Sequence, residues 1–191
     1  MLGLHYETPA TWARNALAKP GELLLDHYFC ELKAAAMAQR TLRLYGPKFP
    51  KLKPLMRELA AEEALHADQV KEFLRQYPHE EPKRGGDKYA QELRRAANLS
   101  GNGSLLDLLL VCSLIEARSA ERFKLLADEA HGGTLGNFYA DLYAAEVNHY
   151  KLFVQLAADH CGPERATQRL EELRAAEAAI IKSLPEGARI H

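Results

Sequence analysis

The sequence predicts an all-α protein: an antiparallel four-helix bundle with additional short helices packed outside it. No segment shows a sustained alternation of apolar and polar residues, the pattern of a half-buried strand. Four long segments instead repeat apolar residues every three to four positions, as amphipathic helices do. Proline and glycine number only 9 and 12 among 191 residues and mostly separate these segments. Each of the four segments has 24 residues or more. A helix of 24 residues is about 36 Å long at 1.5 Å per residue, and helices of this length are typical of such bundles.

Local signals place the helices of the first half. Thr8 is predicted to cap a short helix with Pro9 at its first position. Gly46-Pro47 ends the first long helix, and Pro78 follows the second. The stretch from Pro78 to Asp87 is predicted to be a polar loop. The predicted helices of this half cover about residues 8–18, 22–45 and 52–76.

The second half is read in the same way. A short helix is predicted before the turn-rich stretch 98–104, whose Ser104 can cap the third long helix. Gly132-Gly133 separates the third long helix from the fourth, and Gly162-Pro163 separates the fourth from a terminal helix. The predicted helices of this half cover about residues 88–97, 104–130, 135–160 and 164–183.

Length and composition limit the class of protein. A chain of 21.4 kDa is expected to form one domain over residues 1–191. The net charge of −1 argues against nucleic-acid binding through overall charge, although a local basic patch is allowed. The sequence shows no signal peptide or membrane span, and its three distant cysteines suggest reduced thiols. We therefore expect a cytoplasmic protein with no membrane association.

The core-facing stripe of every long helix carries a glutamate near its middle. These are Glu31, Glu63, Glu116 and Glu146, and their neighbours three, four and seven positions away are predominantly apolar. Burying an unpaired carboxylate costs several kcal/mol, so four in one core must take up protons or bind cations. Glutamates on solvent-exposed helix faces would instead have polar neighbours at these positions.

Spacing favours metal ions. Glu63 and His66 form an E-x-x-H motif, as do Glu146 and His149, and positions i and i+3 share a helix face. A lone glutamate precedes each motif, by 32 residues in the first half and by 30 in the second, which suggests two helix hairpins related by a pseudo-two-fold axis. Four glutamates and two histidines in this order are the ligands of a dinuclear iron or manganese site. The predicted ligands are Glu31, Glu63, His66, Glu116, Glu146 and His149.

Other polar residues near these positions have open roles. His27, one turn before Glu31, is expected either to hydrogen-bond a ligand or to be a structural core histidine. Arg118 and Glu121 belong to an ion-pair network beside the site, or Arg118 faces a phosphate. Glu62 and Glu121 fit the ligand pattern poorly, because Glu62 lies off its stripe and Glu121 breaks the repeat.

Four segments of the sequence resemble a known family. Residues 24–35, 62–66, 114–123 and 145–149 are similar to those of the tRNA 2-methylthio-N6-isopentenyladenosine hydroxylases, a branch of the ferritin-like superfamily. The likeness covers about residues 5–160, and the stretch Ile115-Glu-Ala-Arg-Ser-Ala-Glu-Arg-Phe123 is its most specific part. No strong likeness extends beyond Gly162.

The resemblance implies a ferritin-like non-haem di-iron monooxygenase. Such an enzyme hydroxylates the isopentenyl side chain of a modified adenosine next to the tRNA anticodon, using O₂ and an external electron donor. Carried over residue by residue, the family's ligands for two iron ions fall on the six residues predicted above from spacing. We expect a monomer or dimer. The alternatives are a ferritin- or rubrerythrin-like protein that oxidises iron or reduces peroxide, and a metal-free helical scaffold.

Contact with tRNA requires a local basic surface. Lys48, Lys51, Lys53 and Arg57 form a run of positive charges with no acid between them, and they are candidates for phosphate contact. A second group is diluted by acids and contains Lys83, Arg84, Lys88, Arg94 and Arg95. Ordinary solvated charge is the alternative for both groups.

Overall fold

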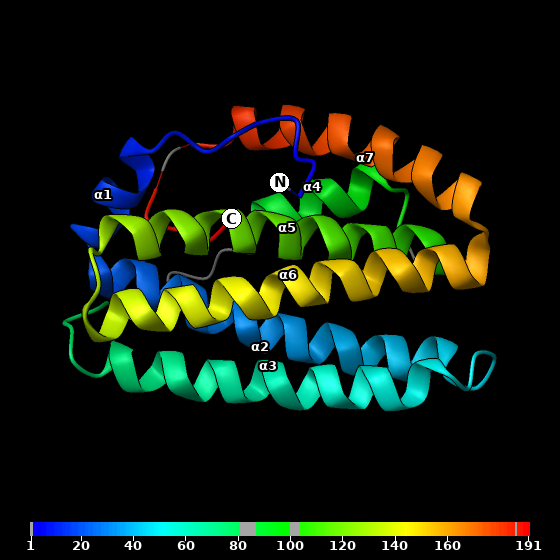
Figure 1. The fold of residues 1–191 in the computed structure, drawn as a ribbon, viewed down its shortest axis with the longest axis horizontal. Coiled ribbons are helices and arrows are strands. Elements are labelled where there is room, and N and C mark those ends of the chain that lie inside the picture. Colours follow the sequence, from blue (N-terminus) through cyan, green and yellow to red (C-terminus); the bar gives the residue numbers. More distant parts are fainter. Residues whose placement is uncertain (1, 81–86, 100–103, 186) are drawn as a thin grey trace. The chain divides into compact units, whose positions relative to one another are not determined.

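All the regular secondary structure in the described part of the chain is α-helical. In this computed structural model it comprises residues 2–80, 87–99, 104–185 and 187–191, which form seven α-helices and no strand (Figure 1). The predicted all-α class is confirmed. Residues 81–86 and 100–103, which contain parts of the predicted loop and turn, lie outside the described residues. Among the described helices, none has the length and apolar character needed to cross a membrane.

The helices fall into two compact units. The first, called the α2–α3 unit, comprises residues 15–83 and 188–190, and the second, called the α5–α6 unit, comprises residues 1–14, 84–187 and 191. The short helix α1 (Thr11–Leu17) spans the point at which the chain passes between them. The prediction of a single domain remains a prediction.

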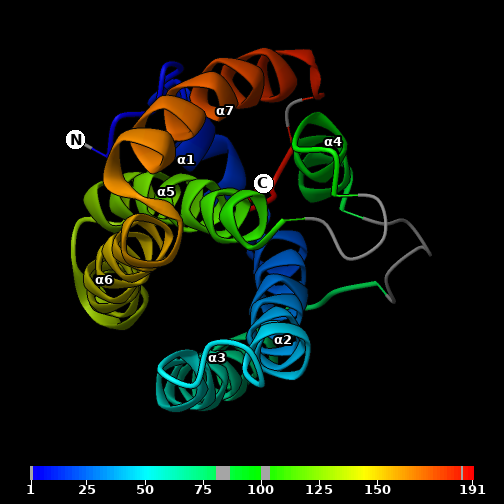
Figure 2. The same ribbon diagram turned by 90° about the vertical axis from the view of Figure 1, so that its right-hand side faces the viewer.

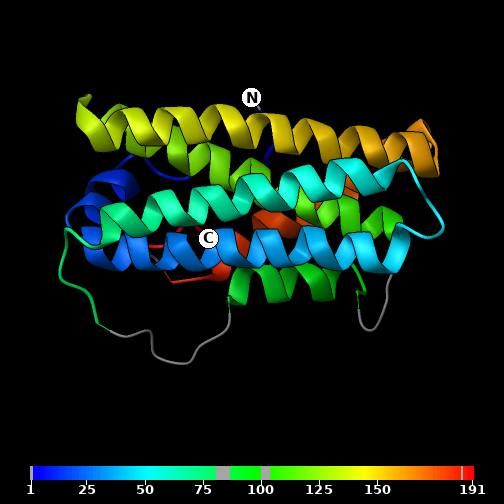
Figure 3. The same ribbon diagram turned by 90° about the horizontal axis from the view of Figure 1, so that it is seen from below.

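The α2–α3 unit is a hairpin of two long helices. Helix α2 (Pro20–Tyr45) and helix α3 (Leu52–Leu74) run antiparallel along their length (Figures 1 and 3). Helix α2 has Pro20 in its first turn, where the missing amide hydrogen has no helical partner to lose. Gly21 lies against the segment that follows α3, since a Cβ there would stand 2.1 Å from the Pro78 carbonyl oxygen. The start of α2 and the segment after α3 are therefore packed closely at the end of the hairpin opposite its turn.

The α5–α6 unit contains a second antiparallel hairpin. Helix α5 (Leu105–Glu129) pairs with helix α6 (Gly133–Cys161). Helix α7 (Pro163–Ser183) packs against both and against the short helix α4 (Lys88–Ala96), as Figure 2 shows. Gly162 joins α6 to α7 with a φ of 91°, a conformation that favours glycine. The unit is thus a hairpin covered by two further helices.

The predicted cap of α5 is confirmed, and the predicted cap of α1 is wrong. Ser104 caps α5 by accepting a hydrogen bond from the Asp107 amide at 3.0 Å, as predicted. Thr8 does not cap α1, which begins at Thr11. The Thr8 amide and hydroxyl instead donate to the Glu121 carboxylate, at 2.8 and 2.6 Å. A long-range carboxylate partner has replaced the local capping interaction.

Candidate metal centre

The α2–α3 unit brings together three of the predicted ligands. Glu31 on α2 and Glu63 and His66 on α3 are buried, and each offers a donor atom within 4.8 Å of the other two. His66 Nδ1 lies 3.2 Å from Glu63 Oε2 and 3.9 Å from Glu31 Oε2. We call these three residues the Glu31 half-site. Its two helices present the donors to one another because the E-x-x-H motif and the lone glutamate both lie on buried stripes.

The α5–α6 unit repeats this arrangement. Glu116 on α5 and Glu146 and His149 on α6 are buried, with donor atoms again within 4.8 Å of one another. His149 Nδ1 lies 3.1 Å from Glu146 Oε2, a distance within 0.1 Å of that in the first motif. We call these residues the Glu116 half-site. The repeat in sequence is therefore also a repeat in local geometry.

The donor set of each half-site fits a divalent metal ion. In octahedral coordination with bonds of about 2.1 Å, neighbouring ligand atoms are about 3 Å apart. The carboxylate-to-imidazole distances of 3.2 and 3.1 Å match that spacing. Two carboxylates also balance the charge of one divalent ion, and the four glutamates are exposed by only 1 to 6%. Imidazole nitrogen with carboxylate oxygen is a donor set suited to iron or manganese.

His27 supports the Glu31 half-site from the preceding turn of α2. Its side chain is fully buried, and its Nε2 lies 2.7 Å from Glu31 Oε1. When Glu31 is ionised, as a metal ligand is, its carboxylate only accepts hydrogen bonds, and Nε2 of His27 is then the donor. The contact fixes one carboxylate oxygen of Glu31, a predicted ligand, whose other oxygen faces His66.

Arg118 and Glu121 lie in a buried polar network of the α5–α6 unit. Arg118 donates from Nε and Nη2 to the two carboxylate oxygens of Glu177 on α7, at 2.9 and 3.0 Å, and forms an ion pair with Glu121. Tyr89 on α4 donates to Glu177 at 3.0 Å, and the Tyr6 carbonyl accepts from Arg118 at 2.9 Å. These bonds tie the N-terminal segment, α4, α5 and α7 together.

Burial and ion pairing shift the pKa values of Arg118 and Glu177 in opposite directions. Burial alone would lower the pKa of Arg118, but Glu177 and Glu121 raise it above its ordinary value. Burial raises the pKa of Glu177, against the lowering influence of Arg118 and Tyr89. Sequence reasoning missed Glu177, although it lies in phase with Leu170 and Leu173 on the buried face of α7. Its place within an apolar stripe is the same signal that marks the four predicted glutamate ligands.

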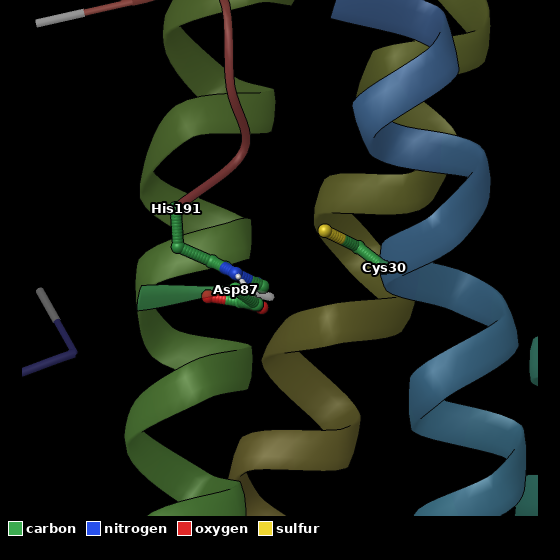
Figure 4. Close-up of side chains that lie close together, drawn as sticks. All are labelled: Cys30, Asp87 and His191. Atoms are coloured by element: carbon green, nitrogen blue, oxygen red, sulfur yellow. Dashed lines mark ion pairs between the residues drawn. The ribbon is translucent and has the colours of Figure 1, made fainter. Parts of the chain in front are cut away.

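A second polar contact anchors the end of the α5–α6 unit. Asp87 caps α4 by accepting from the Ala90 amide at 3.0 Å. His191 Nδ1 lies 3.3 Å from Asp87 Oδ2, and Figure 4 shows the two side chains against each other. The His191 ring also stacks on Tyr89 at 5.2 Å between centroids. This contact links the chain's last residue to the network through Tyr89.

The first group of predicted basic residues lies at the turn of the α2–α3 hairpin, and the described residues of the second group lie on α4. Lys48 and Lys51 are in the turn between α2 and α3, and Lys53 and Arg57 are in the first turns of α3. In the second group, Lys83 and Arg84 lie outside the described residues. Arg94 and Arg95 border a shallow hollow at the end of α4 together with Gln91, Asn98 and Leu99.

Comparisons with known proteins agree on one family. The family model described as tRNA-(MS2IO6A)-hydroxylase (MiaE) matches residues 2–191. A protein of Pseudomonas putida, named tRNA 2-(methylsulfanyl)-N(6)-isopentenyladenosine(37) hydroxylase, is 34% identical over 184 residues, covering 96% of this chain and 89% of the relative. A Salmonella typhimurium protein of the same name is 28% identical and covers 98% of this chain and 87% of the relative.

A solved structure shows the same fold. It is described as protein 43 with aldehyde deformylating oxygenase activity from Synechococcus, and it is 34% identical to this chain with a TM-score of 0.88. The match covers 98% of this chain and 94% of that one. It confirms the ferritin-like fold class. The family match spans nearly the whole chain, and the chain therefore belongs to the tRNA-(MS2IO6A)-hydroxylase family.

Proposed function

We propose that the protein is an O₂-dependent di-iron monooxygenase that hydroxylates the isopentenyl side chain of 2-methylthio-N6-isopentenyladenosine in tRNA. The observation that carries the proposal is the pair of matching half-sites in a member of this family. Each half-site supplies two carboxylates and one imidazole, and the two half-sites are proposed to provide the ligands of two iron ions. The proposed metal ligands are Glu31, Glu63, His66, Glu116, Glu146 and His149.

Iron supplies the oxidative chemistry when it is bound. Bound ferrous iron would supply the activation of O₂ that a hydroxylation needs, in which one oxygen atom enters the C–H bond, the other leaves as water, and an external donor provides two electrons and two protons. The chain's residues set the conditions. Four carboxylates compensate the metal charge, His27 holds Glu31 in place, and burial keeps water from the ligands. Activity in the cytoplasm as a monomer or dimer is part of the proposal.

Metal content provides the first test. Protein expressed with ample iron should contain nearly two iron ions per chain, and Glu63→Ala or His149→Ala should lower that number. Glu62→Ala is the matched control, because Glu62 is the exposed neighbour of Glu63 on the same helix. Metal-free wild-type protein, or equal iron loss in the control, would rule out these ligands.

Nucleoside analysis provides the second test. Cells lacking the gene should accumulate tRNA with the unhydroxylated isopentenyl group, and the wild-type gene should restore the hydroxylated form while Glu63→Ala does not. Unchanged hydroxylation after deletion, in cells without a second hydroxylase, would contradict the proposed substrate.

A second candidate reaction is aldehyde deformylation, favoured by the activity in the description of the Synechococcus structure. The purified protein should be given a long-chain aldehyde and the tRNA substrate in parallel, with the same reductant. Turnover of the aldehyde without hydroxylation of tRNA would replace the proposed function. Iron oxidation or peroxide reduction without either organic product would favour the ferritin-like alternative.

A further inference from the structure

One end of the α2–α3 hairpin carries unusually concentrated positive charge. Between Glu31 and Glu58 the chain has no acidic residue and seven lysines or arginines. Five of these seven surround the turn, and we call them the basic tip: Arg43, Lys48, Lys51, Lys53 and Arg57. Within the described residues, none of the five is paired with a carboxylate. The basic tip therefore offers its charge to an outside partner.

The turn that carries these cations is well ordered by hydrogen bonds. The Phe49 amide donates to the Tyr45 carbonyl at 2.8 Å, and the Lys53 amide donates to the Pro50 carbonyl at 3.1 Å. The Lys48 ammonium lies over the Phe49 ring, 5.5 Å from its centroid. A fixed backbone holds the cations at set positions, which lowers the entropy lost when they bind a partner.

The three lysines of the basic tip are far from the Glu31 half-site along the same hairpin, whereas Arg57 lies six residues before Glu63, about 9 Å along α3. Glu31 precedes the end of α2 by 14 residues, which is about 21 Å at 1.5 Å per residue. Glu63 follows the start of α3 by 11 residues, which is about 16 Å. At about 3.4 Å per nucleotide step in a duplex, the basic tip lies about five steps from a nucleotide at the half-site. The three lysines therefore lie nearer to phosphates several steps away than to those of that nucleotide.

We propose that the basic tip binds phosphates in the helical stem of the tRNA, several nucleotides from the base that is modified. This inference rests on the proposed function. Lysines and arginines that each neutralise a phosphate release counterions and supply affinity that does not depend on base sequence. The basic tip thus distinguishes a folded RNA from a free nucleoside, whereas the half-sites act on the side chain of one base.

An acidic electron-donor protein is the other partner that this charge could attract. Protein–protein interfaces are depleted in lysine and have an apolar centre. Three of the five cations in the basic tip are lysines, and this composition favours a phosphate backbone over a protein surface.

Salt-dependent RNA binding tests the inference without any need for turnover. The probe is a labelled 17-nucleotide tRNA stem-loop, and its binding is measured by fluorescence anisotropy over a range of salt concentrations. Lys48→Gln, Lys51→Gln and Lys53→Gln together should reduce the slope of log K against log salt by about two to three units. The same variant should bind about tenfold more weakly at physiological salt.

Three comparisons make the result specific. Lys124→Gln, Lys151→Gln and Lys182→Gln remove the same charge from exposed lysines of the α5–α6 unit and should leave the slope nearly unchanged. Arginine at positions 48, 51 and 53 should retain the slope. A five-nucleotide loop fragment without the stem should bind equally well to the wild type and to the glutamine variant.

The inference is overturned if the glutamine variant keeps the wild-type slope, if the control variant loses as much, or if the loop fragment shows the same loss. It is also overturned if Arg94→Gln with Arg95→Gln, at the hollow on α4, accounts for the slope instead. If the wild-type protein hydroxylates tRNA and one of these results is obtained, only this inference is refuted. Wild-type protein that neither binds nor hydroxylates RNA refutes the proposed function as well.

Discussion

His27 and Glu31 form a buried hydrogen bond of 2.7 Å between consecutive turns of α2. Eighty-five residues later, the repeat places Cys112 at the position of His27 and Glu116 at the position of Glu31. An imidazole therefore supports the ligand of one half-site, where the other has a buried thiol. The two proposed metal positions are inequivalent for this reason.

Removing His27 should weaken one metal position more than the other. Loss of a hydrogen bond that orients a ligand costs about 10- to 100-fold in metal affinity. His27→Ala should therefore turn the titration of metal-free protein with Co²⁺ or Fe²⁺ into two clearly separated steps. Cys112→Ala is the control at the equivalent position and should change neither step by as much. A uniform shift of both steps would show that His27 has only a general structural role.

Arg118 and Glu177 should depend on each other for stability. Arg118 is fully buried, and removing one partner of a buried ion pair typically costs about 3–5 kcal/mol. We expect a loss of this size in urea unfolding of metal-free Arg118→Met. The double variant with Glu177→Leu should recover most of the loss, because the charge that remains, Glu121, is partly exposed and keeps its hydrogen bonds from Thr8. Additive losses in the double variant would contradict the coupling.

The loss in Arg118→Met should also depend on pH. Burial already raises the pKa of Glu177 above its ordinary value of 4.5, and without Arg118 this pKa should rise further. An acid with a raised folded-state pKa contributes full stability below its unfolded-state pKa and loses that stability as pH rises through the folded-state pKa. The variant should therefore be closest to the wild type near pH 4 and furthest from it near pH 7. A difference that does not vary over this range would argue against a charged Glu177 as the cause.

Gly21→Ala should destabilise the α2–α3 unit. Alanine normally stabilises an exposed helix interior by about 1 kcal/mol relative to glycine. Here the added Cβ would stand 2.1 Å from the Pro78 carbonyl oxygen, which belongs to the backbone and has little freedom to move. Overpacking of this kind costs about 1–3 kcal/mol, so a lower unfolding midpoint is expected. A higher midpoint would mean that the segment after α3 yields easily.

The cysteines should differ in their reactivity toward iodoacetamide. Burial, and to a lesser degree Glu116, raises the pKa of the Cys112 thiol, while burial raises that of the half-exposed Cys161. The thiolate is the reactive form. Mass spectrometry should find Cys161 alkylated slowly in folded protein and Cys112 alkylated only after unfolding. Early modification of Cys112 would indicate that α5 opens locally.

Helix class and most helix ends could be predicted because they depend on local signals. Ser104 and Gly162 determine their boundaries by capping and by backbone conformation. The metal ligand pattern was also readable, since a carboxylate within an apolar stripe is a local anomaly. The partners of Thr8 and Glu177 could not be assigned in the same way, although the place of Glu177 within an apolar stripe is itself a local signal. Their partners lie more than 50 residues away, and distant pairing has no local signature.

The Arg118 to Glu177 ion pair also determines how α7 can pack. Around Glu177 the helix is rich in alanine, with four alanines between positions 175 and 179, and small side chains fix the register of a helix less firmly than large ones. A shift of α7 along α5 by a turn would separate Glu177 from Arg118 and leave the buried Glu177 carboxylate without its ion-pair partner. The cost of several kcal/mol restricts α7 to a single register against α5. This polar contact thus adds to the register that Leu170, Leu173 and Ile181 set on the same face.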